Sequence, residues 1–352
     1  MICSSKTCSI VPPYLLARIA DLQDGTYQRA ADAARRALAE LPPVHEARSR
    51  SLRPPASARG TAAAPSLRRE VSDAEEREVL PGTLVRKEGD APTGDAAADE
   101  AYEGLGATDA LFRDSYGRTS VDGTGGTLAA TVHYGREYDN AFWNGERMVF
   151  GDGDGEIFQR FTKSLTVIGH ELTHGVVQYT SGFEYSGQAG ALNESAADVF
   201  GVLVEQKLLR QEAARATWLV GAGLFTAQVT GEALRSLKAP GTAYNDDVLG
   251  RDPQPATMAD YVDTEADNGG VHINSGIPNH AFYLAATAMG NFAWERAGQI
   301  WYDTLTEQDL PEDCTFSRFA AATLAAADKR YGSASAEYES VSDAWEAVGV
   351  QP

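Results

Sequence analysis

The 352-residue sequence predicts an α+β protein of two lobes, with a β-rich lobe over residues 67–164 and an α-helical lobe over residues 165–352. Short β-like stretches bounded by glycine turns, such as residues 83–86, 131–134 and 147–150, run through the first lobe. Helical periods of apolar residues dominate the second lobe. A change in composition separates both lobes from an N-terminal head.

The head, residues 1–50, is predicted to contain an extended segment and a helix. Residues 10–16 are apolar and include two adjacent prolines, which disfavour a helix there. Apolar side chains then recur at spacings of four and three from residue 27 to residue 41. This spacing indicates an amphipathic helix, which Pro42 and Pro43 should end.

Residues 51–66 are predicted to form an exposed linker, because they are rich in proline, alanine, serine and arginine and show no apolar period. Residues 1–66 carry nine basic and five acidic side chains, whereas the rest of the chain has a net charge of −24. The acidic body argues against nucleic acid as a partner. A basic head on an acidic body suggests that the head docks there, although an acidic surface usually serves only solubility.

The composition leaves the cellular compartment open. No run of eighteen apolar residues occurs, which excludes a membrane span. The first ten residues lack a continuous apolar stretch, so no secretory signal peptide is visible. The three cysteines, Cys3, Cys8 and Cys314, do not make a disulfide framework.

The motif His170-Glu171-Leu172-Thr173-His174 predicts a zinc site with its own general base. Residues four apart share one face of a helix, so the imidazoles of His170 and His174 can bind one metal ion. Glu171 lies one step round the helix, where it can reach a water molecule without binding the metal. The alternative is a pair of surface histidines on an ordinary helix.

A second acidic motif supplies the third metal ligand. Glu194 and Asp198 are four residues apart at the start of an apolar helical run, so their carboxylates share a face. Two histidines and one glutamate are a standard ligand set for catalytic zinc, which keeps a fourth position open. Asp198, together with Asn193, is placed to orient the ligands, because a ligating histidine normally donates its other ring N–H to an oxygen atom.

A third, glycine-rich cluster, residues 267–276, precedes a long apolar helical pattern. With this cluster the sequence resembles the thermolysin-like metallopeptidases. The resemblance extends from about Leu80 to the C-terminus and includes two further motifs, residues 140–145 and 151–155, which look like the substrate-binding edge strand and the hairpin after it. The helix that carries His170 would then line a cleft between the two lobes.

The resemblance implies a role for each matching residue in a zinc-dependent endopeptidase. His170, His174 and Glu194 would hold one zinc ion, and Glu171 would deprotonate water and later protonate the leaving amine. Tyr185 and His272 would stabilise the oxyanion of the tetrahedral intermediate, and Asp267 would hold His272 charged and oriented. The substrate main chain would bind Asn140, Ala141 and Arg235.

The resemblance also implies a preference for cleavage before hydrophobic residues. The pocket for the residue after the cleaved bond maps onto four apolar side chains, Phe158, Phe161, Val167 and Leu234, with Arg235 at its edge.

The substrates would be proteins and peptides, and the enzyme would be a monomer. Secretion is the location that the family favours, and the cytoplasm is the alternative.

The head resembles the short propeptide of the protealysin-like branch of this family. In that branch a proline pair occupies the primed side of the cleft, and here the corresponding segment is Pro12, Pro13, Tyr14 and Leu15. The chain would then be an inhibited precursor, with the head as a partner in cis. The alternative is a disordered basic tail with one docking helix. A thiolate from Cys8 or Cys3 on the zinc is chemically possible but is the less favoured mode of inhibition.

Two features could separate this chain from other thermolysin-like enzymes. Thr166 stands where thermolysin has an acidic residue, and residues 206–225 contain only one acid, Glu212, so the double calcium site is expected to be absent.

The rival to a peptidase is a catalytically silent relative that binds zinc or peptides. The presence of Glu171, Tyr185 and His272 together argues against that rival, since a binding protein needs neither a base nor oxyanion donors.

Overall fold

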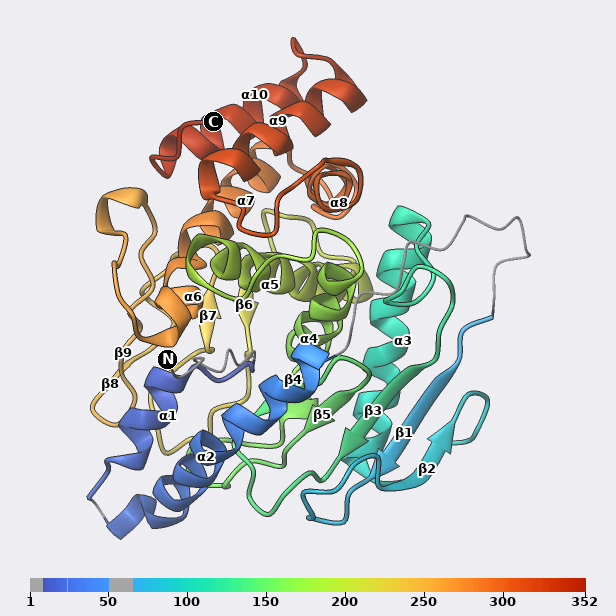
Figure 1. Ribbon diagram of the computed structural model, residues 1–352, viewed down its shortest axis with the longest axis vertical. Helices are drawn as coiled ribbons and strands as arrows, with labels where there is room; N and C mark the ends of the chain where they lie inside the picture. The colour runs from blue at the N-terminus through green and yellow to red at the C-terminus, as the bar shows by residue number, and fades with distance from the viewer. Residues whose placement is uncertain (1–8, 24, 51–65) are drawn as a thin grey trace.

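The computed structural model describes residues 9–23, 25–50 and 66–352, arranged as a sheet-containing lobe and a helical lobe with an N-terminal head across them (Figure 1). The N-terminal lobe is built on a five-stranded mixed sheet in the order β2-β1-β3-β5-β4. β3 pairs in parallel with β1 and β5, whereas β2 and β4 pair antiparallel at the two edges. The strands are β1 (Arg69–Asp73), β2 (Thr83–Lys87), β3 (Leu128–Val132), β4 (Ala141–Trp143) and β5 (Met148–Phe150).

The predicted strands at 83–86, 131–134 and 147–150 overlap β2, β3 and β5, but the sequence did not reveal a long helix in the same lobe. This helix, α3 (Ala96–Tyr116), begins at Asp95, whose carboxylate accepts from the amide of Ala98, and ends at the left-handed Gly117. Its buried face mixes small residues, such as Ala101 and Gly104, with large ones, such as Leu105 and Phe112. A Cβ on Gly104 would lie 2.4 Å from a methyl group of Ile168, so the close approach of α3 to Ile168 requires glycine at this position.

The C-terminal lobe is mainly helical, as the sequence predicts, and short ribbons and 3-10 turns connect its helices. Figure 1 shows α5 running through its centre, with α8, α9 and α10 on one side. The elements are η2 (Phe161–Lys163), α4 (Leu165–Gln178), α5 (Gly187–Leu209), β6 (Leu219–Val220), β7 (Arg235–Ser236), β8 (Asn245–Asp246), β9 (Gly250–Arg251), η3 (Met258–Asp260), α6 (Asp267–Asn274), α7 (Gly276–Met289), α8 (Ala297–Glu307), α9 (Phe316–Tyr331) and α10 (Ala336–Ala347).

Helices α4 and α5 approach each other closely because glycines stand at their contact. A Cβ on Gly201 would lie 2.6 Å from the carbonyl oxygen of Thr166, and one on Gly169 would lie 3.0 Å from the Cα of Gly201. Only a residue without a side chain permits this approach. The approach brings the acidic motif of α5 against the His-Glu motif of α4. Within the described part of the chain, no helix is both long and apolar enough to cross a bilayer.

The described part of the head consists of residues 9–12, α1 (Pro13–Ala20), the turn η1 (Gly25–Tyr27) and α2 (Gln28–Arg50). Two predictions about it were wrong. The segment 10–16, expected to be extended, enters α1 at Pro13, because proline occupies the first turn of a helix, where its missing N–H costs nothing. In addition, α2 continues past Pro42 and Pro43 to Arg50. The fixed φ of proline is compatible with helical backbone, so these prolines remove hydrogen bonds without ending the helix.

The head contacts both lobes through basic side chains. Arg18 in α1 donates to the carbonyl oxygens of Asp247 and Val248, both at 2.8 Å, in the C-terminal lobe. On the N-terminal lobe, Arg29 of α2 pairs with Glu156 at 2.9 Å, and Arg36 pairs with Glu137 at 3.3 Å. The charge difference read from the sequence therefore corresponds to real contacts. The expected linker, residues 51–66, lies outside the described residues except for Ser66.

Candidate metal centre

Three potential ligand side chains meet between α4 and α5. The Nε2 atoms of His170 and His174 lie 3.0 Å apart on one face of α4. The two carboxylate oxygens of Glu194 on α5 each lie 3.6 Å from one of these nitrogens. All three side chains are fully buried, and among the described residues they form the one cluster of three or more His, Cys, Asp or Glu groups able to hold a metal ion.

The hydrogen bonds around the two histidines fix where their ring protons lie. His170 Nδ1 is 2.8 Å from Asp198 Oδ1, and His174 Nδ1 is 2.9 Å from Asn193 Oδ1. The amide of Asn193 cannot be reversed without loss, because its Nδ2 donates to the carbonyl of Phe183 at 3.3 Å. Each Nδ1 therefore donates, and each Nε2 presents a lone pair to the space beside Glu194. Two imidazole lone pairs and a carboxylate converging in a buried space suit a cation, and this donor set fits zinc.

Both acidic residues of α5 are held in their charged forms. Burial favours the neutral form of Glu194, but the nearby His272, His174 and His170 outweigh it and lower the pKa of Glu194 to about 2. Burial acts in the same direction on Asp198, and there Arg235 and His170 hold the pKa well below its usual range. An ionised Asp198 can only accept hydrogen bonds, which keeps the Nδ1 proton on His170.

Asp198 is the centre of a buried network that the sequence only partly revealed. Besides His170, it accepts from Arg235 through two nitrogens, Nε at 2.8 Å and Nη2 at 2.9 Å, and from Asn279 Nδ2 at 2.9 Å. Arg235 was expected to bind a substrate carbonyl, but its pairing with Asp198 was not foreseen. Asn279 was missed altogether, because a single amide inside an apolar helical pattern gives no signal of its position.

Glu171 lies beside the edge of the sheet. Its Oε2 accepts from the main-chain amide of Trp143 in β4 at 2.8 Å, within a fully buried setting. β4 is an edge strand, paired only with β5, so its outer edge carries main-chain groups that face the centre. The carboxylate of Glu171 is thus fixed between the ligand helix α4 and this edge.

A third group of side chains closes the other side of the centre. The hydroxyl of Tyr185 donates to Glu194 and lies 3.2 Å from His272 Nε2. Asp267 accepts from both the main-chain amide of His272, at 2.9 Å, and its Nδ1, at 2.6 Å. Burial opposes the charge on His272, but Asp267 and Glu194 outweigh it and raise the pKa of His272 to about 9. His272 is therefore a charged donor whose Nε2 faces the centre, 3.6 Å from Glu194.

The main chain of the head lies against the groups around the centre. Residues 9–11 are buried, and Ser9, Ile10 and Val11 each bond to the body of the protein. The bonds are His272 Nε2 to the Ser9 carbonyl at 3.0 Å, the Ile10 amide to the Ala141 carbonyl at 3.1 Å, Arg235 Nη1 to the Ile10 carbonyl at 3.0 Å and the Val11 amide to Asn140 Oδ1 at 3.0 Å. Of the four residues expected to dock, Pro12 and Leu15 are buried, and Pro13 and Tyr14 are half-buried.

The four apolar residues expected to form the primed-side pocket all lie in the buried core. The rings of Phe158 and Phe161 lie 5.6 Å apart, and Val167 and Leu234 are equally inaccessible to solvent. Leu234 directly precedes Arg235, which binds the Ile10 carbonyl. Cys3 and Cys8, considered as zinc ligands, lie outside the described residues.

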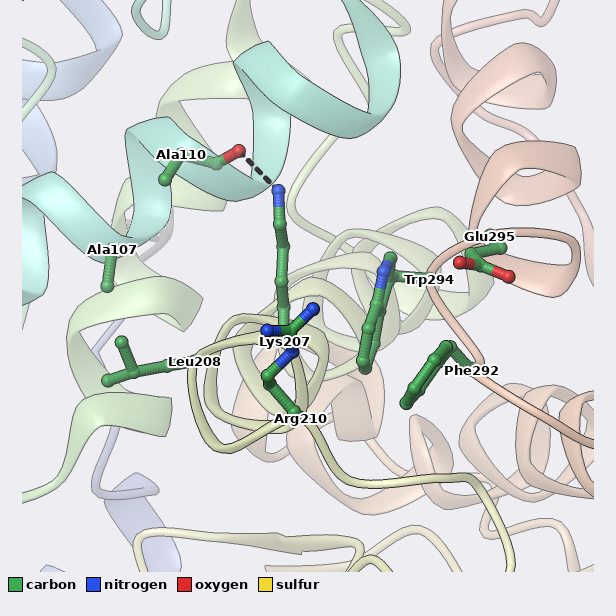
Figure 2. A pocket seen from close by; sticks show the side chains of 8 residues that line it. All are labelled: Ala107, Ala110, Lys207, Leu208, Arg210, Phe292, Trp294 and Glu295. Carbon is green, nitrogen blue, oxygen red and sulfur yellow. Dashed lines mark hydrogen bonds between the residues drawn. The ribbon is translucent and has the colours of Figure 1, made fainter.

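A separate cavity of about 410 Å³ lies between α3, the end of α5 and the loop before α8 (Figure 2). Lys207 crosses it and donates to the carbonyl of Ala110 at 2.8 Å, and the rings of Phe292 and Trp294 stack at 4.5 Å on the opposite wall. None of its lining residues belongs to the metal centre.

Comparison with protein families matches most of the chain. The model described as thermolysin metallopeptidase, catalytic domain, matches residues 60–178. The model described as thermolysin metallopeptidase, alpha-helical domain, matches residues 181–350. The two matches include every residue of the metal centre but not the head.

Individual relatives extend the similarity to the head. An extracellular metalloprotease of Pectobacterium carotovorum is 48% identical over 349 residues, which cover 99% of this chain and 98% of the relative. The thermolysin of Alicyclobacillus acidocaldarius is 40% identical over 79% of this chain but only 50% of its own length. Among solved structures, the precursor of protealysin, a metalloproteinase from Serratia proteamaculans, superposes with a TM-score of 0.88 at 49% identity and covers 97% of this chain and 99% of its own.

Proposed function

The chain belongs to the thermolysin family and is a zinc metalloendopeptidase, and we propose that it cleaves before hydrophobic residues and that its own head inhibits it. The observation that carries the proposal is that residues 9–11 are bonded to the residues expected to act on or hold a substrate, His272, Ala141, Arg235 and Asn140. The head would be a propeptide that occupies the cleft as a substrate does.

His170, His174 and Glu194 would hold the zinc ion, with Asp198 and Asn193 orienting the two imidazoles. When bound there, zinc acts as a Lewis acid and makes water more acidic. Glu171 takes the proton of the attacking water and delivers it to the leaving nitrogen, which is the work of a general base and then a general acid. The Trp143 amide supports this role because it holds one carboxylate oxygen and so orients the other.

The developing oxyanion would be stabilised by His272 and Tyr185. His272 is suited to this because Asp267 holds the ring in position and favours its charged form. A preorganised donor aimed at an oxyanion typically contributes about 3–4 kcal/mol to the barrier. Asn140, Ala141 and Arg235 would align the substrate main chain, as they align residues 10 and 11 of the head.

Replacing Glu171 with Gln tests the reaction. The variant should retain one zinc ion per chain but lose peptide hydrolysis by at least about 100-fold, because general-base catalysis contributes about 10²–10⁴-fold. Glu194→Ala should instead lose the metal. Glu205→Gln, a half-buried change on the same helix, is the control and should retain both. Normal hydrolysis by Glu171→Gln would refute the role of Glu171, and a metal-free Glu171→Gln would point to a ligand instead of a base.

The preference for hydrophobic residues is inferred from the pocket that the family resemblance implies. Lining residues such as Phe158, Phe161, Val167 and Leu234 would favour an apolar side chain by about 0.8 kcal/mol for each buried CH₂ group and penalise a charge. Cleavage should therefore fall before Leu, Ile, Val or Phe. A cleavage profile on a peptide library, recorded with enzyme cut in the linker, tests this. A profile dominated by charged residues after the cleaved bond would exclude it.

Inhibition by the head would depend on its attachment. In one chain the effective concentration of the head at the cleft is of order millimolar, so even weak binding fills the site. A chain with an uncleavable linker should show little activity, and cutting the linker should raise it sharply. Replacing Pro12 and Pro13 with Ala should weaken docking and speed processing, whereas Gln28→Ala, which loses only exposed bonds to Asp32, should not. Equal activity of intact and cut chains would remove the inhibitory role.

Two further expectations remain proposals. The double calcium site is proposed to be absent, because the hydroxyl of buried Thr166 already accepts from the amide of Gly221 at 2.9 Å, and calcium requires several oxygen ligands together. Secretion is proposed because a relative from Pectobacterium carotovorum is described as extracellular. Calcium content after dialysis, and the location of the protein in a fractionated culture, would test these two points.

A further inference from the structure

We propose that the peptide bond between Ser9 and Ile10 is a self-cleavage site, and that the head remains in the cleft afterwards as a bound product. This inference rests on the proposed function of the same site. It goes further because it names one bond of this chain as a substrate and predicts the N-terminus of the inhibited form. Both residues of the bond are described by the structure and are buried.

The carbonyl group of this bond lies where hydrolysis would develop negative charge. The Ser9 oxygen accepts from His272 Nε2 at 3.0 Å, and the hydroxyl of Tyr185 lies 3.2 Å from the same nitrogen. His272 is therefore already bonded to the oxygen that becomes the oxyanion when water adds to the carbonyl carbon. The next carbonyl along the chain, that of Ile10, is bonded to Arg235 instead and has no such donors. The donors thus select a single bond of the head.

The amide nitrogen of the same bond faces the edge of β4. The Ile10 amide donates to the carbonyl of Ala141 at 3.1 Å, and two residues further along this strand the amide of Trp143 donates to Glu171. Main-chain groups of residues i and i+2 point to the same side of a strand, so the leaving nitrogen and the Glu171 carboxylate share one edge. The group that must receive a proton therefore lies on the same strand edge as the group that can supply it.

The chain after the bond is held more firmly than a short-lived substrate requires. Asn140 binds Val11 twice, from the Val11 amide to Oδ1 at 3.0 Å and from Nδ2 to the Val11 carbonyl at 3.4 Å. The side chains of Ile10 and Val11 are fully buried, and α1 begins two residues later at Pro13. These contacts all lie on the Ile10 side of the bond, so they persist when it is cut.

The reaction needs only water. Water adds to the carbonyl carbon of Ser9 while Glu171 takes one proton, the C–N bond to Ile10 breaks, and the proton passes to the Ile10 nitrogen. The products are a fragment of residues 1–9 ending in a carboxylate and a chain that begins with the amine of Ile10. The new amine stays against the Ala141 carbonyl, on the strand edge that also holds the Glu171 carboxylate. Cutting this bond therefore does not open the cleft.

The mass of the intact chain tests the inference. The full-length protein is purified without metal, zinc is added, and the N-terminus is followed by mass spectrometry at several protein concentrations. The expected result is loss of residues 1–9 at a rate independent of concentration and at least about 100-fold slower in Glu171→Gln. Ile10→Pro should remain uncut because it removes the amide bonded to Ala141, and Gln28→Ala should be cut like the parent.

Two further measurements separate this inference from the proposed function. In Glu171→Gln, hydrogen exchange should show protected amides at Ile10 and Val11, and unprotected amides would overturn the register. In parallel, linker-cut enzyme is given an unrelated reporter peptide. Hydrolysis of the reporter with an intact Ser9–Ile10 bond, or cleavage at another bond of residues 9–16, would overturn self-cleavage and leave the peptidase assignment standing. No hydrolysis of either would overturn the proposed function itself.

Discussion

Arg235 and Asp198 form a fully buried ion pair joined by two parallel hydrogen bonds, of 2.8 Å and 2.9 Å. Each partner has a second task. Asp198 accepts the ring proton of His170, and Arg235 donates to the Ile10 carbonyl of the head. One pair of side chains therefore connects the candidate metal ligand to the segment that lies over it, and a change at either partner should affect both.

Asp198→Asn should weaken zinc binding. The amide removes the negative charge that holds the Nδ1 proton on His170, and changes to such supporting residues typically cost about 10–100-fold in metal affinity. Competition with a chromophoric chelator measures the affinity. Asp303→Asn is the matched control, because Asp303 is also a buried carboxylate paired with an arginine, Arg330 at 2.6 Å, but lies in α8. Equal zinc affinity in Asp198→Asn and the parent would contradict the prediction.

Arg235→Met should destabilise the fold by about 3–5 kcal/mol, since it leaves the charge of Asp198 buried without its main partner. It should also loosen the head, which loses the bond to the Ile10 carbonyl. Urea unfolding measures the first effect, and hydrogen exchange at Ile10 and Val11 the second. Arg86→Met is the control: Arg86 is buried and paired with Asp99, but it lies at the far edge of the sheet. Loss of stability with unchanged protection of the head would show that Arg235 does not hold it.

Asp139→Asn should stabilise the protein at neutral pH. Burial, and next the charge and hydrogen bond of Asp154, raise the pKa of Asp139 well above its usual range. The folded state therefore keeps a proton that the unfolded state loses above about pH 4, and this penalty grows as pH rises. An amide stays neutral and can donate to Asp154. The gain in thermal midpoint should be present at pH 7 and vanish near pH 4.

Asp154→Asn is the control for that experiment, and the opposite result is expected. The carboxylate of Asp154 accepts from the main-chain amides of Glu156 at 2.5 Å, Ile157 at 2.6 Å and Phe158 at 3.3 Å. The three amides stabilise the negative charge of Asp154 in the folded state, so its removal should lower the free energy of unfolding. Stabilisation by both changes would mean that the proton is not localised on Asp139.

His133→Asn should destabilise the protein by about 1–3 kcal/mol in mildly acidic solution and hardly at all above pH 10. The hydrogen bond to Asp152 outweighs partial burial and, with Asp95, raises the pKa of His133 to about 9. A raised folded-state pKa gives stability that is complete below the unfolded value of about 6.5 and lost as pH rises through about 9. Asn tolerates the left-handed backbone of position 133, where φ is 52°, so the comparison isolates the charge. A pH-independent difference in unfolding free energy would contradict this.

The sequence alone was sufficient for the parts of the site that lie within one helix. The spacing of His170 and His174 places both imidazoles on one face of α4, and the spacing of Glu194 and Asp198 does the same on α5, because 3.6 residues complete a turn. It also indicated the helical nature of the second lobe. These features follow from local periodicity, which a sequence displays directly.

Local patterns failed where small residues or prolines hid the element. α3 was missed because small residues such as Ala101 and Gly104 interrupt the apolar pattern of its buried face, and α2 continued past Pro42 and Pro43, where a stop was expected. Packing and a compatible φ angle decided otherwise.

Only the tertiary structure decided which distant residues share a contact. The pairing of Arg235 with Asp198, the amide of Asn279 on the same carboxylate, and the contact of His272 with the Ser9 carbonyl join residues tens to hundreds of positions apart. Each such contact depends on the approach of whole elements, for example the glycine contact that lets α4 and α5 meet. A sequence states which groups are present, but their distances are set by packing, and both catalysis and inhibition depend on those distances.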